Sequence, residues 1–585
     1  MLFFFSKSDS MKKTALLSFF IFVVLGTIAQ TQISISSQTA DNILKGNYNP
    51  ADYTNTPLKA SPKDLPNEIY GQINTDSLKS YITTLSKLYT RHTSSDTISS
   101  DTGIGATRRW VHQKFQQFSS ASNNRLVTGY VDFRAFICNV LWHKNVIAVL
   151  PGKDINNHQV VIIEGHMDSR CSDNCDRTCR AEGVEDNASG TVLVMELARV
   201  MSLYDYDHTI VFMATTGEEQ GLVGASAMAD YCKSENIPVK AVLNNDVIGG
   251  IICGETSSPP SCPGLNDIDS LNTRIFSYGS YRSPSKGLAR YVKLQYKESL
   301  TNSPVKVALH IMTNEDRIGR GGDHIPFRGN GFPAIRFTSA NEHGDASNGP
   351  DYNDRQHTEE DILGVDTDGD QVVDSFFVDF NYLKRNGSIN ATAAANIANA
   401  PETPEFSIMP LDYDLLQVTI TSAENHPQYR VGVRSTTNDW DSVYTSTSKT
   451  INLALYDSNA YYISVAAVNQ YGIESLFSME ELQVMTSLNE DEAEIKGIEL
   501  WQNKPNPFDE STIIPIYAGA EEQGKLASLT ITDLSGNVVY QKEERLVAGL
   551  NEWPYHHGFG ALGTFIYTLA VEGELIGSKK MTFAY

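Results

Sequence analysis

Histidine and carboxylate side chains recur in this sequence directly after short apolar runs. Imidazole nitrogen and carboxylate oxygen are donors that zinc accepts in proteins. In an α/β fold, ligands bind beyond the carboxyl ends of the strands, so residues that follow different strands can meet at one edge of the sheet. Such residues are His166 and Asp168 in EGHMDSR, Glu218 and Glu219 in TTGEEQG, and Asp246 in NNDVIGG. Asp186 in EDNASG follows a cysteine-rich loop, and His357 in DRQHTEED ends the loop after Ala334–Phe337. Together they predict a metal centre.

The number of donors is enough for two metal ions. Two histidines and three carboxylates can hold a zinc pair about 3.5–4 Å apart if one carboxylate bridges and a water is shared. Asp168 lies two residues after His166 and can orient that imidazole. The neighbours Glu218 and Glu219 offer one ligand and one free base, which can pass a proton from the water to a leaving amine. Each residue alone is more often structural, but the ordered set predicts hydrolysis. No HExxH, GxSxG or P-loop motif competes with it.

The elements that must position these residues alternate between strand-like and helix-like segments. Helices are expected over 75–92, with Asp76 as N-cap, over 106–118 and over 191–201. Buried strands are expected at Val146–Leu150, Val160–Ile163, Ile210–Ala214, Ala241–Leu243, Val305–Leu309 and Ala334–Phe337. This alternation predicts an α/β three-layer sandwich with a mostly parallel central sheet.

The pattern changes near residues 394–404, after which only short strands and turns follow. Strands are expected at Leu416–Ile420, Tyr429–Val433, Thr450–Leu453 and Tyr461–Val468. An acidic linker, NEDEAE at 489–494, then precedes a final all-β segment. We therefore expect two all-β sandwich domains after the α/β domain. The predicted division is a signal peptide at 1–29, a leader or strap at 30–69, an α/β domain at 70–399, and β-sandwiches at 402–488 and 497–585.

The first residues indicate export. Lys12 and Lys13 precede an apolar run over 14–24, and Ala29 offers a small residue for cleavage. An N-terminal membrane anchor is the alternative, and no later stretch is apolar enough to span a membrane. The net charge of −24 argues against a nucleic-acid partner, which needs a basic surface.

The chain has seven cysteines, and export makes disulfides plausible. Cys253 and Cys262 flank one loop and are expected to pair. At least one pair is expected among Cys171, Cys175 and Cys179, with a thiolate zinc site as the alternative. Because seven is odd, one thiol stays unpaired, and Cys138 in an apolar run is our candidate.

The motifs GHMDS, EDNASG, TTGEEQGLVGA, NNDVIG and RQHTEED resemble those of the co-catalytic dizinc aminopeptidases of clan MH, relatives of bacterial leucyl aminopeptidase. The resemblance covers about residues 70–397. It implies that His166 and Asp246 bind one zinc ion, that Glu219 and His357 bind the other, and that Asp186 bridges them. It also places Glu218 as the general base and implies a cis peptide bond after Asp186.

The segment GGDHIPFRGNGFPAIRF also resembles glutaminyl cyclases, which share the fold but use one zinc ion. The DNASG stretch and the complete ligand set favour the peptidase. We expect Asp323 and His324 to line the pocket without binding metal. An insertion, GVDTDGDQVVD, places Asp366, Asp368, Asp370 and Asp374 around Gly369. It resembles a calcium loop, with an acidic surface turn as the alternative.

The two C-terminal segments also resemble known modules. Residues 404–487 resemble a fibronectin type III domain through YYISVAAVNQYGIES. Residues 499–585 resemble the C-terminal sorting domain of type IX secretion through LWQNKPNPFDESTIIPIY and LTITDLSGNVVY. That resemblance implies a type IX secretion machinery as partner, outer-membrane export to the cell surface or medium, and removal of the domain by proteolysis. A terminal carbohydrate-binding sandwich is the alternative.

These observations predict an exported zinc exopeptidase that removes N-terminal residues from peptides through a hydroxide bridging two zinc ions. Two alternatives stay open. One is a mono-zinc enzyme that cyclises N-terminal glutamine, and the other is a surface adhesin with a vestigial enzyme domain. The sequence leaves open the side-chain preference and the choice between aminopeptidase, carboxypeptidase and dipeptidase.

Overall fold

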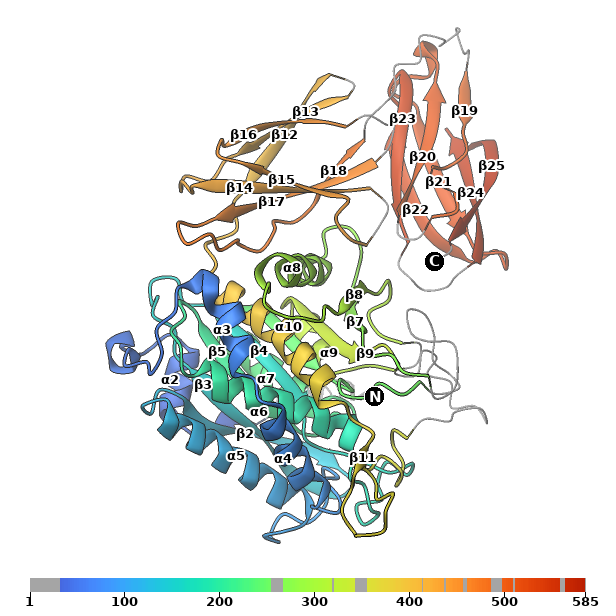
Figure 1. The fold of residues 1–585 in the computed structure, drawn as a ribbon. Helices are drawn as coiled ribbons and strands as arrows, with labels where there is room; N and C mark the ends of the chain where they lie inside the picture. The colour runs from blue at the N-terminus through green and yellow to red at the C-terminus, as the bar shows by residue number, and fades with distance from the viewer. Residues whose placement is uncertain are drawn as a thin grey trace, which may run out of the picture.

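The computed structural model describes most of the chain, and the predicted signal peptide at 1–29 lies outside the described residues. The described ranges are 32–253, 267–317, 320–341, 355–412, 414–435, 438–455, 460–484, 497–504, 506–508, 511–557 and 563–583. A sheet covered by helices forms the first part of the structure, and four antiparallel sheets form the last part (Figure 1). None of the helices in these ranges combines the length and the apolar character that crossing a bilayer requires.

The first part is built on a nine-stranded sheet of order β1-β2-β3-β5-β4-β6-β9-β7-β8. Its strands are β1 (Ile33–Ile35), β2 (Val127–Ile137), β3 (Val140–Leu150), β4 (Val160–His166), β5 (Thr209–Thr215), β6 (Val239–Asn245), β7 (Asn272–Ser277), β8 (Ala308–Ile311) and β9 (Ala334–Ser339). The central strands β5, β4, β6 and β9 are parallel. On one side of this group, β1 pairs antiparallel with β2, β2 with β3, and β3 with β5. On the other side, β7 pairs antiparallel with β9. The sheet is therefore mixed, where the sequence predicted a mostly parallel one.

The prediction of a parallel strand at Val146–Leu150 is wrong. These residues form the end of β3, which pairs antiparallel with both β2 and β5. The reason is the tight connection between β2 and β3. Cys138 and Asn139 form it with left-handed backbone, at φ 43° and φ 70°. A connection this short can join only antiparallel neighbours.

Two hydrophobic cores lie on opposite faces of this sheet. Along β3, Val146, Ala148 and Leu150 belong to one core, and Ile147 and Val149 belong to the other. The first core takes in helices α3, α4, α5, α6, α8 and α10, and the second takes in α2 and α7. The helices are α2 (Gln38–Leu44), α3 (Leu65–Gln72), α4 (Thr75–Ser86), α5 (Gly103–Ala121), α6 (Ser189–Met201), α7 (Val223–Ser234), α8 (Pro284–Ser299), α9 (His324–Gly329) and α10 (Phe380–Ala398).

The predicted helices are present, with shifted ends. The expected helix over 75–92 is α4, which stops at Ser86. Its N-cap is Asn74 rather than Asp76, because the Asn74 side chain accepts from the amides of Asp76 and Ser77. The strand expected at Val305–Leu309 is found three residues later, as β8. The expected strap contributes β1, which pairs with β2 at the edge of the sheet.

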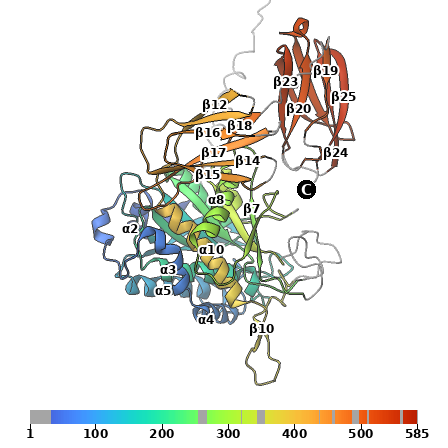
Figure 2. The ribbon, with the colours of Figure 1, turned by 45° about the horizontal axis from the view of Figure 1, so that its top comes forward.

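The remaining chain forms pairs of antiparallel sheets (Figures 1 and 2). The strands expected between 416 and 468 are confirmed as β13, β14, β16 and β17. A short hairpin, β10 (Gly364–Val365) and β11 (Ser375–Phe376), precedes α10. The other strands are β12 (Phe406–Asp412), β13 (Leu415–Ile420), β14 (Gln428–Arg434), β15 (Ser442–Ser446), β16 (Thr450–Ala454), β17 (Ala460–Val468), β18 (Glu481–Val484), β19 (Ile498–Leu500), β20 (Ser511–Ala518), β21 (Leu526–Thr532), β22 (Val538–Arg545), β23 (Gly549–His556), β24 (Gly563–Val571) and β25 (Glu574–Phe583).

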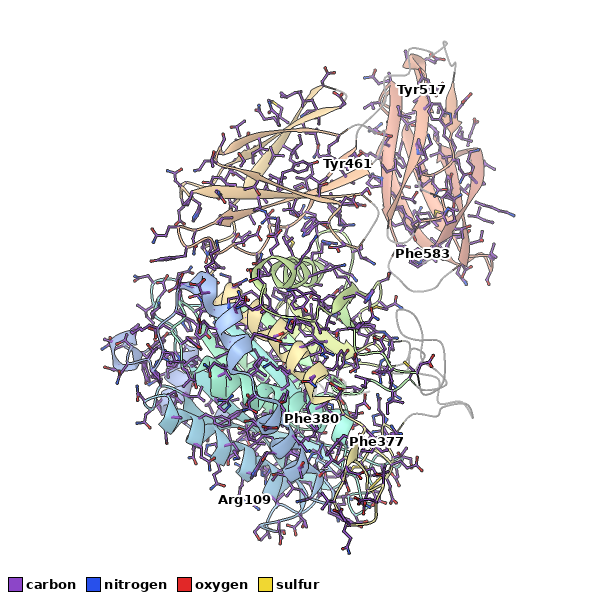
Figure 3. All side chains as sticks on the ribbon, viewed as in Figure 1. Arg109, Phe377, Phe380, Tyr461, Tyr517 and Phe583 are labelled. Atoms are coloured by element: carbon purple, nitrogen blue, oxygen red, sulfur yellow. A yellow bond between two sulfur atoms is a disulfide. The ribbon has the colours of Figure 1, made fainter. Side chains whose placement is uncertain are left out.

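Each pair of sheets encloses its own core. Residues of β13, β14, β16 and β17 form one cluster, against which Tyr461 packs. Residues of β20 to β25 form another, which includes Phe583 (Figure 3). The predicted linker at 489–494 lies outside the described residues. The likeness of these two parts to a fibronectin type III domain and a sorting domain stays a prediction.

Candidate metal centre

The residues singled out by the sequence meet at the carboxyl ends of the central strands. His166 is the last residue of β4, and Asp246 directly follows β6. Glu218 and Glu219 lie in the loop after β5, and Asp186 precedes α6. Because these strands are parallel neighbours, their carboxyl ends open onto one edge of the sheet.

Asp186 lies between the two histidines. Its Oδ1 is 3.2 Å from Nε2 of His166, and its Oδ2 is 3.0 Å from Nε2 of His357. His166 Nε2 is also 3.2 Å from Oδ1 of Asp246. His357 Nε2 is also 3.1 Å from Oε2 of Glu219. Each imidazole therefore faces one oxygen of Asp186 and one oxygen of a second carboxylate.

The donors fit zinc in type and spacing. Ligand atoms in a tetrahedron around one zinc ion lie about 3.3 Å apart, close to the distances above. Donor atoms of His166, Glu218 and Asp246 lie within 4.8 Å of one another, as do those of His166, Asp186 and Glu219. Oε1 of Glu219 is buried and has no hydrogen-bond partner among the described residues. A buried carboxylate oxygen in that state favours a cation beside it.

The shared burial of these groups shifts their pKa values. Burial, together with the carboxylates of Asp246 and Glu219, holds the pKa of Glu218 well above its usual range. Burial opposes protonation of His357, but Glu219 and Asp186 outweigh it and raise the pKa of His357 to about 9. So many acidic groups in one buried volume need positive charge to balance them.

Asp168 supports the metal centre through contacts with two of its parts. Its backbone carbonyl accepts from Nδ1 of His166 at 3.1 Å, while its Oδ1 lies 3.7 Å from the same nitrogen. Its Oδ2 accepts from Oγ1 of Thr93 at 3.0 Å and from the amide of Glu219 at 3.3 Å. Asp168 therefore contacts both the imidazole of His166 and the loop that carries Glu219.

Asp361, to which no role is assigned from the sequence, holds the Asp186 segment in place. Its Oδ1 and Oδ2 accept from the amides of Glu185 and Asp186 at 2.8 and 3.0 Å. The peptide bond between Asp186 and Asn187 is cis, as the resemblance implied. The signal that could have pointed to Asp361 is its position four residues after His357, inside the RQHTEED motif.

Arginine side chains balance the carboxylates, and the sequence analysis missed them. Nε of Arg336 lies 3.0 Å from Oδ2 of Asp246, and its Nη1 donates to Asp316 at 2.8 Å. Nε of Arg170 donates to Oε2 of Glu219 at 2.8 Å. Arg336 is fully buried inside the apolar run AIRF of β9. A charged residue in a buried strand is rare and was a usable signal.

The centre opens into a cavity of about 290 Å³. Its lining residues include Glu218, Arg317, Arg320 and Gln356. The prediction that Asp323 and His324 line the pocket is wrong, because both are fully buried and neither is among the residues that line this cavity. The Asp323 carboxylate accepts from Oγ1 of Thr215, and Nε2 of His324 contacts the carbonyl of Glu315. A larger cavity, of about 730 Å³, lies away from the centre beside α4 and β11.

Three non-glycine residues at this cavity have left-handed backbone. They are Leu222 at φ 60°, Val247 at φ 54° and His357 at φ 61°. This region is unfavourable for L-residues, and most of all for a β-branched one such as Val247. Backbone strain of this kind persists where the surrounding structure enforces it, and it concentrates at functional sites.

The predicted calcium loop forms an exposed turn. Carboxylate oxygens of Asp366, Asp368 and Asp374 lie within 4.8 Å of one another, and Asp370 is not part of that group. The amides of Gly369 and Gln371 donate to Asp366. Calcium binding at this turn stays a prediction.

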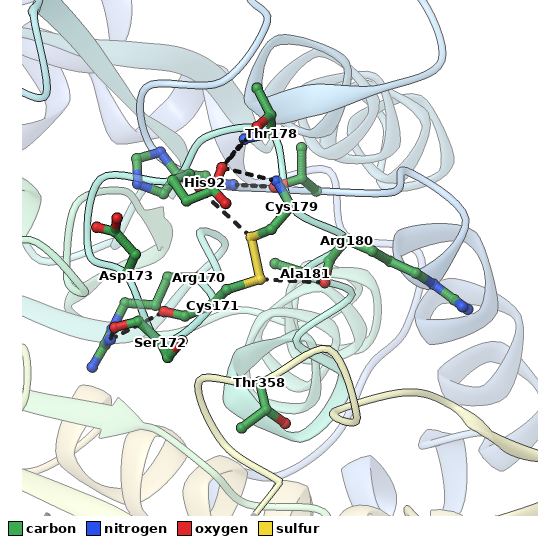
Figure 4. The surroundings of a disulfide bond; sticks show 12 residues. His92, Arg170, Cys171, Ser172, Asp173, Thr178, Cys179, Arg180, Ala181 and Thr358 are labelled. Atoms are coloured by element: carbon green, nitrogen blue, oxygen red, sulfur yellow. Dashed lines mark hydrogen bonds between the residues drawn. A yellow bond between two sulfur atoms is a disulfide. The ribbon is translucent and has the colours of Figure 1, made fainter.

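Two disulfides fix the loop between His166 and Asp186, and Figure 4 shows the one between Cys171 and Cys179. Cys171 pairs with Cys179, and Cys138 pairs with Cys175. Cys138 is therefore not the unpaired thiol, because the β2–β3 turn brings it to this loop. Among the cysteines that the structure describes, the free one is Cys232, buried in α7. Since these loop sulfurs are oxidised, they are not thiolate ligands. Cys253 is disulfide-bonded, and Cys262 lies outside the described residues.

The profile of peptidase family M28 matches residues 145–375. A probable zinc metalloprotease of Leptosphaeria maculans is 31% identical over 396 residues, which cover 65% of this chain and 88% of that protein. The LapA aminopeptidase of Legionella pneumophila is 20% identical, covering 58% of this chain and 75% of that one, with a TM-score of 0.42. A Porphyromonas gingivalis glutaminyl cyclase is 16% identical, covering 55% and 98%, with a TM-score of 0.37.

The matched range includes every residue of the candidate centre, from His166 to His357. The identity to the Leptosphaeria protein extends over most of that protein's length. The chain therefore belongs to peptidase family M28, a family of zinc-dependent hydrolases.

Proposed function

We propose that this protein is a dinuclear zinc exopeptidase that removes N-terminal residues from peptides. The observation that carries this proposal is the position of Asp186, which presents one carboxylate oxygen to each of two histidines. A carboxylate between two imidazoles is the arrangement that a bridged metal pair requires. In an enzyme with one zinc ion, the second histidine and its carboxylate partner would bind no metal.

The side chains divide into two donor sets around Asp186. His166 and Asp246 would hold one zinc ion, His357 and Glu219 would hold the other, and Asp186 would contact both. Zinc bound there polarises a scissile carbonyl and lowers the pKa of a water molecule. Arg336 keeps Asp246 ionised and in place through its contact at 3.0 Å. Asp168 keeps the imidazole of His166 oriented, with Nε2 toward the other donors.

Glu218 would move the proton. Its carboxylate lies among the donor atoms of His166 and Asp246, at the wall of the cavity. It would take a proton from the attacking water and deliver it to the nitrogen of the leaving amine. Burial raises the pKa of Glu218, and a carboxyl with a raised pKa can both accept and release a proton near neutral pH.

The role of Glu218 is tested by Glu218→Gln, which keeps the shape of the side chain and removes its basicity. We expect unchanged zinc content and a kcat on aminoacyl nitroanilides that falls by about 10²–10⁴-fold. Glu182→Gln is the control, since Glu182 pairs with Arg180 and does not line the cavity. Full activity in Glu218→Gln would contradict the proposed base.

The alternative functions make different demands. Cyclisation of N-terminal glutamine by one zinc ion would leave one histidine and its second carboxylate, either His166 with Asp246 or His357 with Glu219, without a metal partner. Adhesion by a vestigial enzyme would not require that the donor set be complete. The contacts of both histidines with Asp186 support the peptidase over either alternative.

We also propose that the protein is exported. The disulfides Cys138–Cys175 and Cys171–Cys179 support this, because disulfides persist in oxidising compartments. Residues 497–585 would direct the chain to the type IX machinery and would then be removable. Deletion of 497–585 in a host with that machinery should leave the enzyme inside the cell envelope, as measured by fractionation and activity. Undiminished release of the truncated chain would contradict the sorting role.

A further inference from the structure

Arg91 is a fully buried arginine in the loop between α4 and α5. Its Nε donates to the carbonyl of Met167 at 2.8 Å, and its Nη2 donates to the carbonyl of Gly183 at 2.8 Å. Its Nη1 donates to the carbonyl of Glu182. Burying a charged group is costly unless its hydrogen bonds are satisfied, so these carbonyls and the guanidinium group hold one another in place.

The three carbonyls belong to two segments that carry proposed metal ligands. Met167 directly follows His166, the last residue of β4. Glu182 and Gly183 lead along the chain to Asp186. One planar side chain therefore spans both segments, at the place where Nε2 of His166 lies 3.2 Å from Oδ1 of Asp186.

The backbone around Arg91 joins the same two segments. Its amide donates to Oγ of Ser169 at 3.2 Å, and that hydroxyl donates to the carbonyl of Ala181 at 2.7 Å. The amide of Ala181 donates in turn to the carbonyl of Tyr89 at 2.9 Å. Ser169 follows β4 and Ala181 precedes Asp186, so main-chain and side-chain hydrogen bonds make the same link.

The close approach of Arg91 requires a glycine at position 183. Gly183 has left-handed backbone, at φ 50°, and a Cβ there would lie 3.1 Å from Nη2 of Arg91 and 2.4 Å from the carbonyl oxygen of Asp186. Further along this segment, the amides of Glu185 and Asp186 donate to Asp361. The segment is therefore held through its carbonyls by a cation and through its amides by a carboxylate.

We propose that Arg91 is a positioning residue that fixes the bridging carboxylate of Asp186 relative to His166. This inference rests on the proposed function, in which these two residues share a zinc ion. A guanidinium group is planar and presents five N–H donors in a rigid fork, so it can bind carbonyls of two segments at once. A lysine would keep the charge, but its single ammonium group on a flexible stem would not reproduce the fork.

Arg91→Lys tests the proposal, because it keeps the positive charge and loses the fork. We expect zinc to bind this variant about 10- to 100-fold more weakly than the wild type, since the carboxylate of Asp186 is no longer held in place. At saturating zinc, kcat on aminoacyl nitroanilides should fall about tenfold or more, with KM changed by less than about threefold. Competition with a chromophoric chelator measures the zinc affinity. The visible absorption bands of the cobalt-substituted protein should also shift, because they depend on ligand geometry.

Arg125→Lys is the matched control. Arg125 is 1% exposed, and its acceptors are not part of the segments that carry proposed metal ligands. They are the carbonyls of Tyr53, Ser202 and Tyr204 and the carboxylate of Asp205. Both lysine variants should unfold at lower urea concentration than the wild type, but Arg125→Lys should keep the zinc affinity, the kcat and the cobalt spectrum. A loss of zinc affinity that is equal in the two variants, or absent from both, would overturn the assignment.

Ser169→Ala is a milder change at the same link, for the case in which Arg91→Lys does not fold. It removes only the hydroxyl that joins the amide of Arg91 to the carbonyl of Ala181. We expect a folded protein that binds zinc about two- to tenfold more weakly than the wild type. If Arg91→Lys is unfolded, an unchanged zinc affinity in Ser169→Ala would overturn the proposal.

The proposed function and the role of Arg91 can fail separately. A wild type that binds two zinc ions and hydrolyses no peptide would overturn the proposed peptidase, and the zinc affinities of the two lysine variants would still decide the role of Arg91. Hydrolysis by the wild type, with equal zinc affinity and kcat in Arg91→Lys and Arg125→Lys, would overturn the role of Arg91 alone.

Discussion

At the scale of single residues, the metal centre depends on a close approach between two backbone segments, the start of α6 after Asp186 and the end of β6. The amide of Gly190 donates to Oδ1 of Asn187 at 2.9 Å, and Nδ2 of Asn187 donates to the carbonyl of Asn245 at 2.8 Å. These bonds tie the start of α6 to the end of β6. The two segments that carry Asp186 and Asp246 are thereby fixed relative to each other.

Gly190→Ala is expected to disrupt this contact. A Cβ at this position would lie 2.2 Å from the carbonyl oxygen of Asn245 and 2.6 Å from Oδ1 of Asn187. The start of α6 must shift, so we expect a loss of stability of about 1–3 kcal/mol and weaker zinc binding. Chemical denaturation and metal analysis measure both effects.

Gly287→Ala is the matched control for that change. Gly287 lies in α8, and no atom lies within 4 Å of the position of a new Cβ. Alanine should stabilise this helix by up to about 1 kcal/mol. Equal stability and zinc content in Gly190→Ala and the wild type would show that the close approach does not matter.

The donors of the proposed metal centre could be predicted from sequence, while the contacts of the residues that support them could not. His166 and Asp246 follow recognisable strands, and their types already indicate a metal. Arg170 carries no such mark, and Asp361 is marked only by its place in the RQHTEED motif, because arginine and aspartate in polar loops are usually solvated. Only the three-dimensional structure shows that these side chains contact Glu219 and the amide of Asp186.

At the scale of elements, a short connection determines a strand direction that the apolar pattern of the sequence does not. β3 looked like a parallel strand because its buried end is continuously apolar, as parallel strands are. Its direction follows from the turn at Cys138 and Asn139. α10 was missed because its centre, NGSINATAAANI, contains glycine, serine, threonine and asparagine, which have low helix propensity. α8 was also missed, although Ser283 as N-cap and Pro284 mark its start.

The turn at Cys138 also stabilises the loop after β4. The Cys138–Cys175 disulfide closes a segment of 37 residues, and Cys171–Cys179 closes one of 8. Replacing Cys138 and Cys175 with serine should lower the free energy of unfolding by about 2–4 kcal/mol, because the unfolded chain regains freedom. The double variant Cys171→Ser and Cys179→Ser should lose less stability. Urea denaturation compares the two, and no loss in either would contradict a structural role for the disulfides.

At the scale of the whole molecule, the α/β part and the first all-β part share a buried interface. Glu480, next to β18, binds Nη1 of Arg290 in α8 and Nη2 of Arg434 in β14, each at 2.8 Å. All three side chains are at most 4% exposed. Tyr291 of α8 also donates to the carbonyl of Glu474 at 2.9 Å. The face of the sandwich that includes β14 and the segments with Glu474 and Glu480 is therefore packed against α8, and this face is not open to another partner.

Glu480→Ala is expected to weaken this interface strongly. It would leave the guanidinium groups of Arg290 and Arg434 buried without their shared carboxylate, at a cost of about 3–5 kcal/mol. The neighbouring Glu481 is the control, since its contact with Arg282 is exposed and should contribute close to nothing. Calorimetric unfolding of both alanine variants measures the difference. Equal unfolding temperatures would contradict a structural role for the buried cluster.

The proposed function requires that one chain hold two zinc ions around Asp186. The most direct measurement is the number of zinc ions per chain, by mass spectrometry of the metal content after dialysis, in the wild type and in His357→Ala. We predict two zinc ions in the wild type, hydrolysis of aminoacyl substrates, and one zinc ion with little activity in His357→Ala. One zinc ion per chain in a fully active wild type, unchanged in His357→Ala, would contradict the account.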